Sequence, residues 1–215
     1  MASGDQAIRC GGVVMEATVT VPTDARGTVI FAHGSGSGRY SPRNQFVARA
    51  LNEANLATVL ADLLTAEEEQ GEQRGGRLRF DIGLLAERVT AIVDWTEQPA
   101  VLLPSRRGLF GASTGAAAAL ITAADRPDEV RAVVSRGGRP DLAGDALPRV
   151  TAPTLLVVGG NDDVVLGLNR EAFETLQCEK DLEVVPGATH LFEEPGALER
   201  VAELSVAWFT THLHP

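Results

Sequence analysis

Short hydrophobic runs alternate with amphipathic segments along nearly the whole chain. Glycine, proline and aspartate bound the runs, and the segments between them carry apolar residues at helical spacing. This order predicts repeated strand and helix units around a mostly parallel sheet of about eight strands, which is an α/β fold. The expected strands are 13–21 (an edge strand or hairpin), 28–32, 57–61, 108–110, 130–135, 153–158 and 182–185, and the expected helices are 41–54, 82–95, 116–121, 166–176 and 198–213, with a short helical or irregular stretch around residue 142.

Length and composition favour one domain spanning residues 1–215. The chain is 44% hydrophobic, which is enough for a full core, and no Pro/Ser-rich linker or charge block divides it. Residues 1–6 lack the pattern of a secretory signal, and no apolar run approaches the ~20 residues that cross a bilayer. We therefore expect a soluble, cytoplasmic protein. Cys10 and Cys178 have neither disulfide-like nor metal-like spacing, so we expect them to be buried as small hydrophobes, with no metal or other cofactor.

The formal net charge of −10 argues against nucleic acid and anionic membranes as partners. A small-molecule substrate is the partner we expect, and the sequence is compatible with either a monomer or a homodimer. The acidic run Glu67–Glu69 is interpreted as a solvated surface loop. No segment is long enough for a separate cap domain, so only loops such as 64–80 would close the active-site cleft.

Residues 111–115, Gly-Ala-Ser-Thr-Gly, fit the G-x-S-x-G pattern of a serine on a sharp turn between a strand and a helix. The residues before the pattern predict a short buried strand, and the alanine-rich residues after it predict a helix. Such a turn exposes a serine oxygen as a nucleophile, although in a chain with 22 glycines the match can also arise as a simple packing turn. Ser113 is therefore the candidate nucleophile, and the remaining chain has to supply its partners.

A serine nucleophile needs an imidazole base and a carboxylate that orients it, which follow in the chain order Ser, Asp or Glu, His in this fold class. Asp162 and Asp163 end a predicted buried strand, and His190 follows the last predicted strand. We assign His190 as the base and favour Asp162 as the acid, leaving Asp163 as a cap of the next helix. The other histidines are assigned no chemistry: His33 is interpreted as a structural residue of its loop, and His212 and His214 as parts of a frayed tail.

The glycine-rich loop 33–38 has two interpretations. A phosphate-binding turn is disfavoured, because Arg39 stands where G-x-G-x-x-G requires glycine and no Gly-Lys-Ser/Thr follows. An oxyanion hole fits better, since a glycine loop allows the backbone to approach a substrate closely. In that interpretation the amides of Ser35 and Thr114 hold the developing oxyanion.

Four segments together carry a family resemblance: 33–36 (His-Gly-Ser-Gly), 111–115, 159–162 (Gly-Gly-Asn-Asp) and 187–192 (Gly-Ala-Thr-His-Leu-Phe). They resemble the small, cap-less α/β-hydrolases of the dienelactone hydrolase family, over about residues 10–212. The resemblance implies an α/β-hydrolase fold with an eight-stranded, mostly parallel sheet flanked by helices, and metal-free hydrolysis of esters or lactones by Ser113, Asp162 and His190. The namesake enzymes carry a cysteine where this chain has Ser113, which shifts the expected substrate toward ordinary carboxylic esters.

The resulting hypothesis is a serine hydrolase that cleaves small carboxylic esters or lactones through an acyl-enzyme. A thioesterase or an organophosphate-ester hydrolase would use the same three residues, and a non-catalytic ligand-binding protein of the same fold is the alternative from another class. Arg39, Tyr40, Arg136 and Arg139 are expected on loops after strands at the active edge, where they are candidate contacts for an anionic substrate group or simply solvated side chains.

Overall fold

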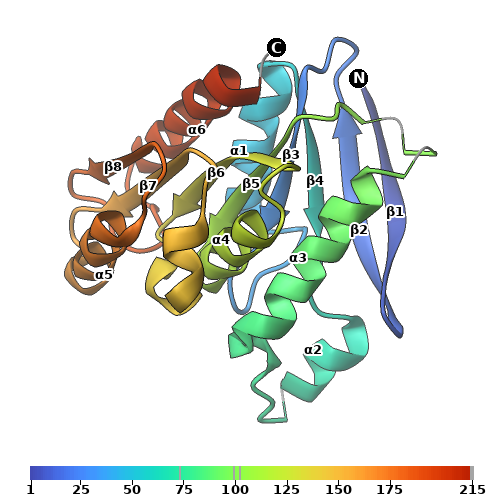
Figure 1. Cartoon of the computed structure of the whole chain (residues 1–215), viewed down its shortest axis with the longest axis horizontal. Helices are drawn as coiled ribbons and strands as arrows, with labels where there is room; N and C mark the ends of the chain where they lie inside the picture. Colours follow the sequence, from blue (N-terminus) through green and yellow to red (C-terminus); the bar gives the residue numbers. More distant parts are fainter. Residues whose placement is uncertain (73, 99, 102, 214–215) are drawn as a thin grey trace.

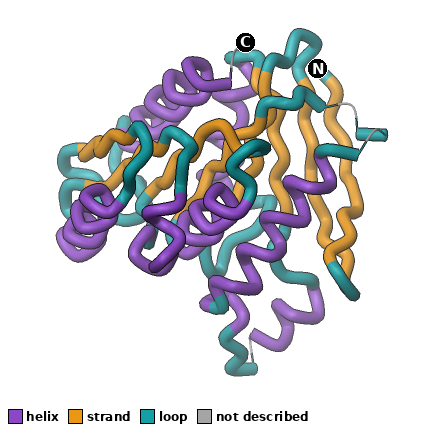
Figure 2. Tube along the Cα trace, viewed as in Figure 1, coloured by secondary structure: helices purple, strands orange, loops and turns teal. Residues whose placement is uncertain are grey.

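An eight-stranded sheet runs through the described part of the chain, with helices on both faces (Figures 1 and 2). The computed structural model describes residues 1–72, 74–98, 100–101 and 103–213. The strand order is β1-β2-β4-β3-β5-β6-β7-β8; β1 and β2 are antiparallel to their neighbours and the other pairs are parallel. The strands are β1 (Ala2–Cys10), β2 (Val13–Val21), β3 (Gly27–Ala32), β4 (Leu56–Ala61), β5 (Arg107–Ala112), β6 (Val130–Arg136), β7 (Thr154–Gly159) and β8 (Lys180–Val185).

Two layers of helices bury the two faces of this sheet. Helices α1 and α6 cover one face, and α3, α4 and α5 cover the other (Figure 1). Successive side chains of a strand alternate between these layers, so that Ile30 packs toward α3 and α4 whereas Phe31 packs toward α1 and α6. No helix in the described ranges is long and apolar enough to cross a membrane. The helices are α1 (Pro42–Glu53), α2 (Ala66–Glu72), α3 (Ile82–Thr96), α4 (Thr114–Asp125), α5 (Asp163–Thr175) and α6 (Ala197–Leu213), with 3₁₀ segments at Leu78–Phe80 and Pro140–Arg149.

The architecture confirms the predicted α/β-hydrolase fold without a cap domain, but the sequence-based assignment missed β1. The first strand pairs along its whole length with β2, from Ala2 opposite Val21 to Cys10 opposite Val13. Only Ile8 of this strand is buried, so it carries no hydrophobic alternation that would reveal a strand. It is β1, and not β2, that forms the edge of the sheet. The free thiols of Cys10 and Cys178 are partly buried, not fully buried as predicted.

The acidic run predicted as a loop forms helix α2 instead. Thr65 and Glu68 cap its start reciprocally: the Glu68 amide donates to Thr65 Oγ1 at 3.2 Å, and the Thr65 amide donates to Glu68 Oε2 at 2.7 Å. This capping box satisfies two amide groups that a helix start leaves without partners, and acidic side chains in the first turn favour the positive end of the helix dipole. Glu68 also binds Arg88 of α3 at 2.8 Å, which ties α2 to the body of the molecule.

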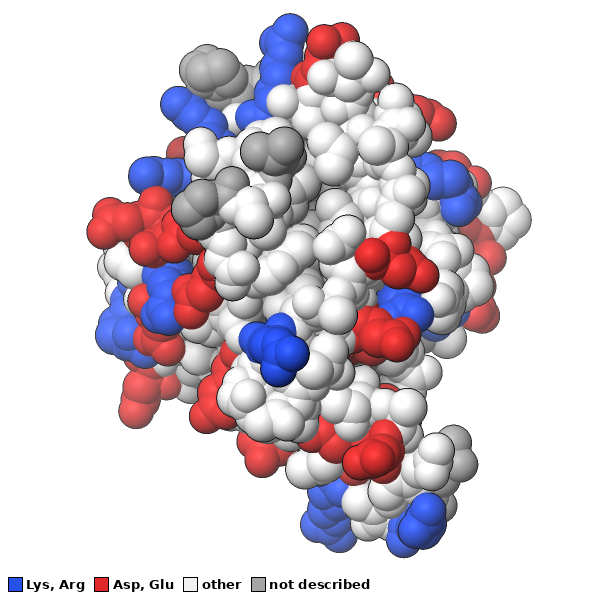
Figure 3. Space-filling view, turned by 90° about the vertical axis from the view of Figure 1, so that its right-hand side faces the viewer, with Lys and Arg blue, Asp and Glu red and all other residues white. Residues whose placement is uncertain are grey.

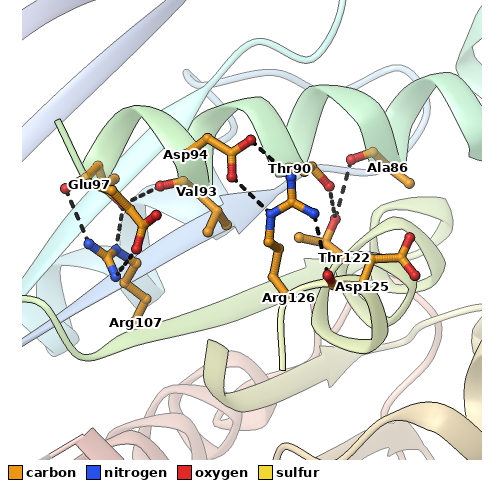
Figure 4. Close-up of polar contacts among 10 residues, drawn as sticks. Ala86, Thr90, Val93, Asp94, Glu97, Arg107, Thr122, Asp125 and Arg126 are labelled. Atoms are coloured by element: carbon orange, nitrogen blue, oxygen red, sulfur yellow. Dashed lines mark hydrogen bonds and ion pairs between the residues drawn. The ribbon is translucent and has the colours of Figure 1, made fainter. Parts of the chain in front are cut away.

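Polar contacts attach the central helix α4 to its neighbour α3 (Figure 4). Arg126, at the end of α4, binds both carboxylate oxygens of Asp94 at 3.0 and 3.1 Å. Within α4, Thr122 Oγ1 donates to the Ala86 carbonyl at 3.2 Å and lies 3.1 Å from Thr90 Oγ1. These contacts hold α4, and with it the turn that precedes the helix, in a fixed orientation.

Candidate active site

Ser113 occupies the turn between β5 and α4, where its backbone is held in a strained conformation. Its φ is +50° and its ψ is −123°, a region that residues with a side chain rarely adopt. Surrounding hydrogen bonds stabilise this geometry: the Ser113 amide donates to the Arg136 carbonyl at 3.4 Å, and the Ser113 carbonyl accepts from the amides of Ala116 and Arg139 at 3.1 and 3.0 Å. The turn has the geometry that the G-x-S-x-G pattern predicts.

The two glycines of the pattern are required by close backbone contacts. A Cβ atom on Gly111 would overlap the backbone of Ala116 in α4, and a Cβ on Gly115 would overlap the carbonyl oxygens of Ala32 and His33 at the end of β3. Helix α4 therefore lies directly against the sheet, and the turn presents Ser113 between the ends of β3 and β6.

His190 and Asp162 meet at the same edge of the sheet. Asp162 follows β7, His190 follows the neighbouring parallel strand β8, and His190 Nδ1 lies 2.7 Å from Asp162 Oδ2. Backbone contacts join the two loops, because the Asn161 amide donates to the Ala188 carbonyl at 2.9 Å. With Nδ1 engaged by the carboxylate, Nε2 of His190 is the ring nitrogen available for proton transfer.

The end of β6 lies between the serine turn and the histidine loop. Arg136 accepts the hydrogen bond from the Ser113 amide, and the next residue, Gly137, packs against the histidine loop: a Cβ on Gly137 would lie 3.2 Å from the His190 carbonyl oxygen and 3.6 Å from His190 Nδ1. The predicted nucleophile, acid and base thus lie around the carboxyl ends of β5, β6, β7 and β8, the edge at which α/β sheets carry their sites.

Asp163 does not cap helix α5 as predicted. Asp162 stands at the N-cap position, and Asp163 is the first residue of the helix. Neither side chain makes a capping hydrogen bond there, since Asp162 is turned to His190. The negative charge of Asp163 still lies in the first turn, where the helix dipole favours it.

The glycine loop after β3 brings both predicted oxyanion-hole residues next to Ser113. A Cβ on Gly34 would lie 2.9 Å from Ser113 Cβ, and the amide of Ser35 donates to Thr114 Oγ1 at 3.2 Å. Thr114 opens α4, so its amide has no acceptor within the helix. The sequence predicted that Ser35 and Thr114 belong to one oxyanion hole, but nothing in it indicated that the Thr114 hydroxyl accepts a hydrogen bond from the Ser35 amide.

His33 has the structural role that the sequence predicted. Its Nε2 accepts the Leu63 amide at 2.9 Å, which leaves the ring proton on Nδ1, where it is donated to the Gly34 carbonyl at 3.0 Å. Burial lowers the pKa of His33, so the ring is neutral and links the glycine loop to the segment after β4. His212 belongs to α6, not to a frayed tail, and lies 3.6 Å from Glu179; His214 lies outside the described residues.

The predicted substrate contacts differ in their surroundings. Arg39 is buried and already paired with Glu16 at 2.6 Å and Asp62 at 3.3 Å, and it donates to the exposed Tyr40 hydroxyl at 2.8 Å. Arg139 pairs with Asp141 at 2.7 Å. Arg136 is the last residue of β6 and not a loop residue, and its side chain is buried.

A groove of about 640 Å³ lies beside the glycine loop, between the β1–β2 hairpin and the start of α2. Acidic side chains, among them Glu16, Asp62, Glu67 and Glu69, share its lining with apolar residues, and neither Ser113 nor His190 lines it. Figure 3 shows acidic and basic groups interspersed on the side of the molecule where the hairpin lies. Among the described residues, no cluster of three or more His, Cys, Asp or Glu side chains is arranged to hold a metal ion.

Comparison with known proteins gives one family and a consistent fold. The model of the dienelactone hydrolase family matches residues 15–212. The crystal structure of a dienelactone hydrolase from Anabaena variabilis is 53% identical, covers 99% of both chains and superposes with a TM-score of 0.96. Est1E from Butyrivibrio proteoclasticus, at 19% identity, covers 97% of this chain and 98% of its own with a TM-score of 0.79, a likeness that shows the fold alone.

A curated relative from Mycobacterium tuberculosis H37Rv, described as a candidate phosphoribosyl transferase, is 56% identical over 205 residues. The match covers 94% of this chain but 45% of the relative. The chain therefore spans less than half the length of that relative, and the name describes a protein of which this chain matches only a part.

Proposed function

We propose that this chain, which belongs to the dienelactone hydrolase family, is an esterase-type hydrolase that cleaves small carboxylic esters or lactones through an acyl-enzyme on Ser113. The observation that carries this proposal is the backbone of Ser113, whose φ of +50° lies in the strained region typical of a serine nucleophile. Strain of this kind is retained where the surrounding structure and the function require it. The contact of 2.7 Å between His190 and Asp162 supports the roles of base and orienting acid that we assign to them.

In the proposed mechanism, His190 Nε2 takes the proton of Ser113 as the serine oxygen attacks the carbonyl carbon. Asp162 remains ionised, fixes the tautomer of the ring and stabilises the imidazolium that forms. Collapse of the tetrahedral intermediate breaks the bond to the leaving alcohol, which receives the proton from His190. Water activated by the same ring then releases the acid and restores Ser113, so no cofactor is required.

The oxyanion of both tetrahedral intermediates would be held by the amides of Thr114 and Ser35. The Thr114 amide lies at the positive end of α4, which favours negative charge. The Ser35 amide is bound to Thr114 Oγ1 at 3.2 Å, and the developing oxyanion would replace that hydroxyl as its acceptor. The hydroxyl would thus keep the amide oriented between turnovers.

Small esters and lactones are the substrates that the family and the site support. The 53% identical relative is a dienelactone hydrolase, which brings lactones within the proposed range. The acid-lined groove beside the glycine loop disfavours an anionic group on that side of the substrate, since like charges would meet there. A neutral or cationic part of the ester suits it better.

A panel of substrates tests the proposal. Short aryl esters, lactones, acyl thioesters and phosphotriesters are compared as substrates of the wild type, of Ser113→Ala and of Ser105→Ala, a control that removes an exposed serine before β5. We expect the highest kcat/KM on esters or lactones, loss of that activity in Ser113→Ala, and its retention in Ser105→Ala. Equal ester turnover by Ser113→Ala would overturn the mechanism, and faster turnover of thioesters or phosphotriesters would overturn the substrate class.

A further inference from the structure

Arg136 is a buried cation to which the described residues offer no anionic partner. Its side chain is 7% exposed, and its Nε makes no hydrogen bond. As the last residue of β6 it follows Val134 by two positions, so it projects from the α1 and α6 face of the sheet, where its guanidinium lies 5.9 Å from the ring centre of Phe192. No described carboxylate lies within ion-pair distance of it.

The other buried arginines of the described chain show how unusual this is. Arg39 binds Glu16 and Asp62, Arg88 binds Glu68, and Arg107 binds Glu97. Each of these three guanidinium groups is compensated by at least one carboxylate. A buried charge without such compensation is unfavourable, because the interior replaces its hydration poorly. Arg136 therefore carries an electrostatic cost that no described carboxylate relieves.

A second arginine adds to that cost. Burial, followed by the like charge of Arg43, lowers the pKa of Arg136 to about 10, so the group is still charged at neutral pH. Arg43 lies in the first turn of α1, which contains no acidic residue and where the helix dipole disfavours a cation. Within the described ranges its one carboxylate contact is with Glu193 at 3.4 Å, and that glutamate is 67% exposed. Glu193 directly follows Phe192, whose ring lies 5.9 Å from the Arg136 guanidinium, so both arginines lie beside the segment 192–193.

This region adjoins the proposed catalytic residues. The Arg136 carbonyl accepts the hydrogen bond of the Ser113 amide, and Phe192 follows His190 by two residues. In the sheet, β5 lies between β3 and β6, so Arg136 at the end of β6 and the acid-lined groove beside the loop after β3 lie on opposite sides of the serine turn. An anionic group would be repelled from the groove and attracted to the arginine side.

We propose that Arg136 and Arg43 form a binding site for a phosphate group. Two guanidinium groups, of which only Arg43 contacts a described carboxylate, match a dianion better than a monoanion, and their planar forks bind phosphate oxygens in pairs. The phosphate group is either part of the ester substrate, a role that rests on the proposed esterase function, or a free phosphate ion that binds beside the catalytic residues. Both sources present the same phosphate oxygens to the arginines, and enzyme kinetics distinguish a phosphorylated substrate from a free phosphate ion.

Binding is measured first, with inorganic phosphate titrated calorimetrically into Ser113→Ala, so that no turnover interferes. Arg43→Gln and Arg136→Lys are compared in the same background with Arg131→Gln, which removes the same charge as Arg43→Gln from an exposed position of β6, the strand that carries Arg136. We expect saturable binding that Arg131→Gln leaves intact and that each of the other two substitutions weakens about 10-fold or more. Arg43 is partly exposed, so Arg43→Gln remains informative if Arg136→Lys does not fold.

The kinetic arm uses two 4-nitrophenyl esters, one whose acyl chain ends in phosphate and one that ends in a methyl group. If the group belongs to the substrate, inorganic phosphate competes with the phosphorylated ester only, and Arg43→Gln raises its KM about 10-fold or more. If phosphate alters turnover of both esters alike, it binds as a separate ligand, and the arginine site stands in that form.

The proposal is overturned if phosphate does not bind, if succinate binds more tightly than phosphate, or if Arg43→Gln and Arg131→Gln bind phosphate equally well. These outcomes are independent of the esterase function. Phosphate binding in a protein whose ester turnover survives Ser113→Ala would leave the arginine site standing and reject the serine mechanism. Ester turnover that depends on Ser113 in a protein that does not bind phosphate would support the serine mechanism and reject the arginine site.

Discussion

The carboxylate of Asp162 and the imidazole of His190 are joined by a contact of 2.7 Å between Oδ2 and Nδ1, across the loops that follow β7 and β8. The contact fixes which ring nitrogen is free for catalysis. Asp163, one residue later, belongs to helix α5 and has no such contact with the ring. The two adjacent aspartates therefore have different roles and provide a matched pair for experiment.

Asp162→Asn is expected to lower kcat on a short aryl ester by about 10⁴-fold, because an amide neither fixes the correct tautomer nor stabilises the imidazolium. Asp163→Asn removes the same charge from the first turn of α5 and is expected to retain the activity, with a loss of about 0.3–1 kcal/mol in the free energy of unfolding. Steady-state kinetics and denaturant unfolding of both variants check this. A larger kinetic defect in Asp163→Asn would reverse the assignment.

The hydroxyl of Thr114 is expected to position the oxyanion hole. Thr114→Val keeps the shape of the side chain but removes the acceptor of the Ser35 amide, so we expect kcat to fall about 10- to 100-fold while KM changes less. Thr114→Ser keeps the hydroxyl and should restore most of kcat. If Thr114→Val and Thr114→Ser are equally active, the hydroxyl has no positioning role.

Close packing at the serine turn predicts opposite effects of two glycine substitutions. Gly115→Ala would force a methyl group onto the Ala32 carbonyl and is expected to cost about 2 kcal/mol or more. Gly167→Ala in α5 meets nothing within 4 Å and is expected to stabilise by about 0.5–1 kcal/mol through helix propensity. Urea unfolding of both variants measures the two effects, and a neutral Gly115→Ala would show that α4 is free to move away from β3.

The neutral state of His33 predicts a pH dependence of stability. Its pKa is lowered by burial in the folded protein, so below its ordinary value of 6.5 the unfolded chain binds the proton more readily than the folded one. The free energy of unfolding should therefore fall as the pH drops below about 6.5, with a contribution of up to about 1.4 kcal/mol per pH unit. Unfolding at pH 5.5, 6.5 and 7.5 measures the slope. The slope should be smaller in His33→Gln, and an identical slope would contradict this account.

Most of the fold was predictable because its central strands are short apolar runs and its helices are amphipathic. The edge strand β1 was not, since Ile8 is its one fully buried side chain and a polar strand carries no periodic signal. Helix α2 has a local signal in the sequence, because Thr65 and Glu68 stand at the spacing of a capping box. The charges alone suggest a solvated loop, and the capping box outweighs them.

The chain order of serine, aspartate and histidine predicted the candidate site because each residue follows a recognisable strand. Relationships that depend on distant segments were beyond the sequence. Nothing local to Arg136 indicates that the charge of Arg43 in α1 acts on it, and nothing local to Arg39 indicates that two carboxylates compensate it. Such pairings arise only when the helices pack on the sheet.

Covalent labelling shows whether Ser113 is the nucleophile. The folded protein is treated with a fluorophosphonate, digested, and the adduct located by mass spectrometry, with Ser113→Ala and His190→Ala treated in parallel. We predict one adduct, on Ser113, formed much more slowly in His190→Ala because the serine then lacks its base, and none in Ser113→Ala. A folded protein that hydrolyses esters while Ser113 stays unlabelled, or that is labelled at another residue instead, would contradict the account.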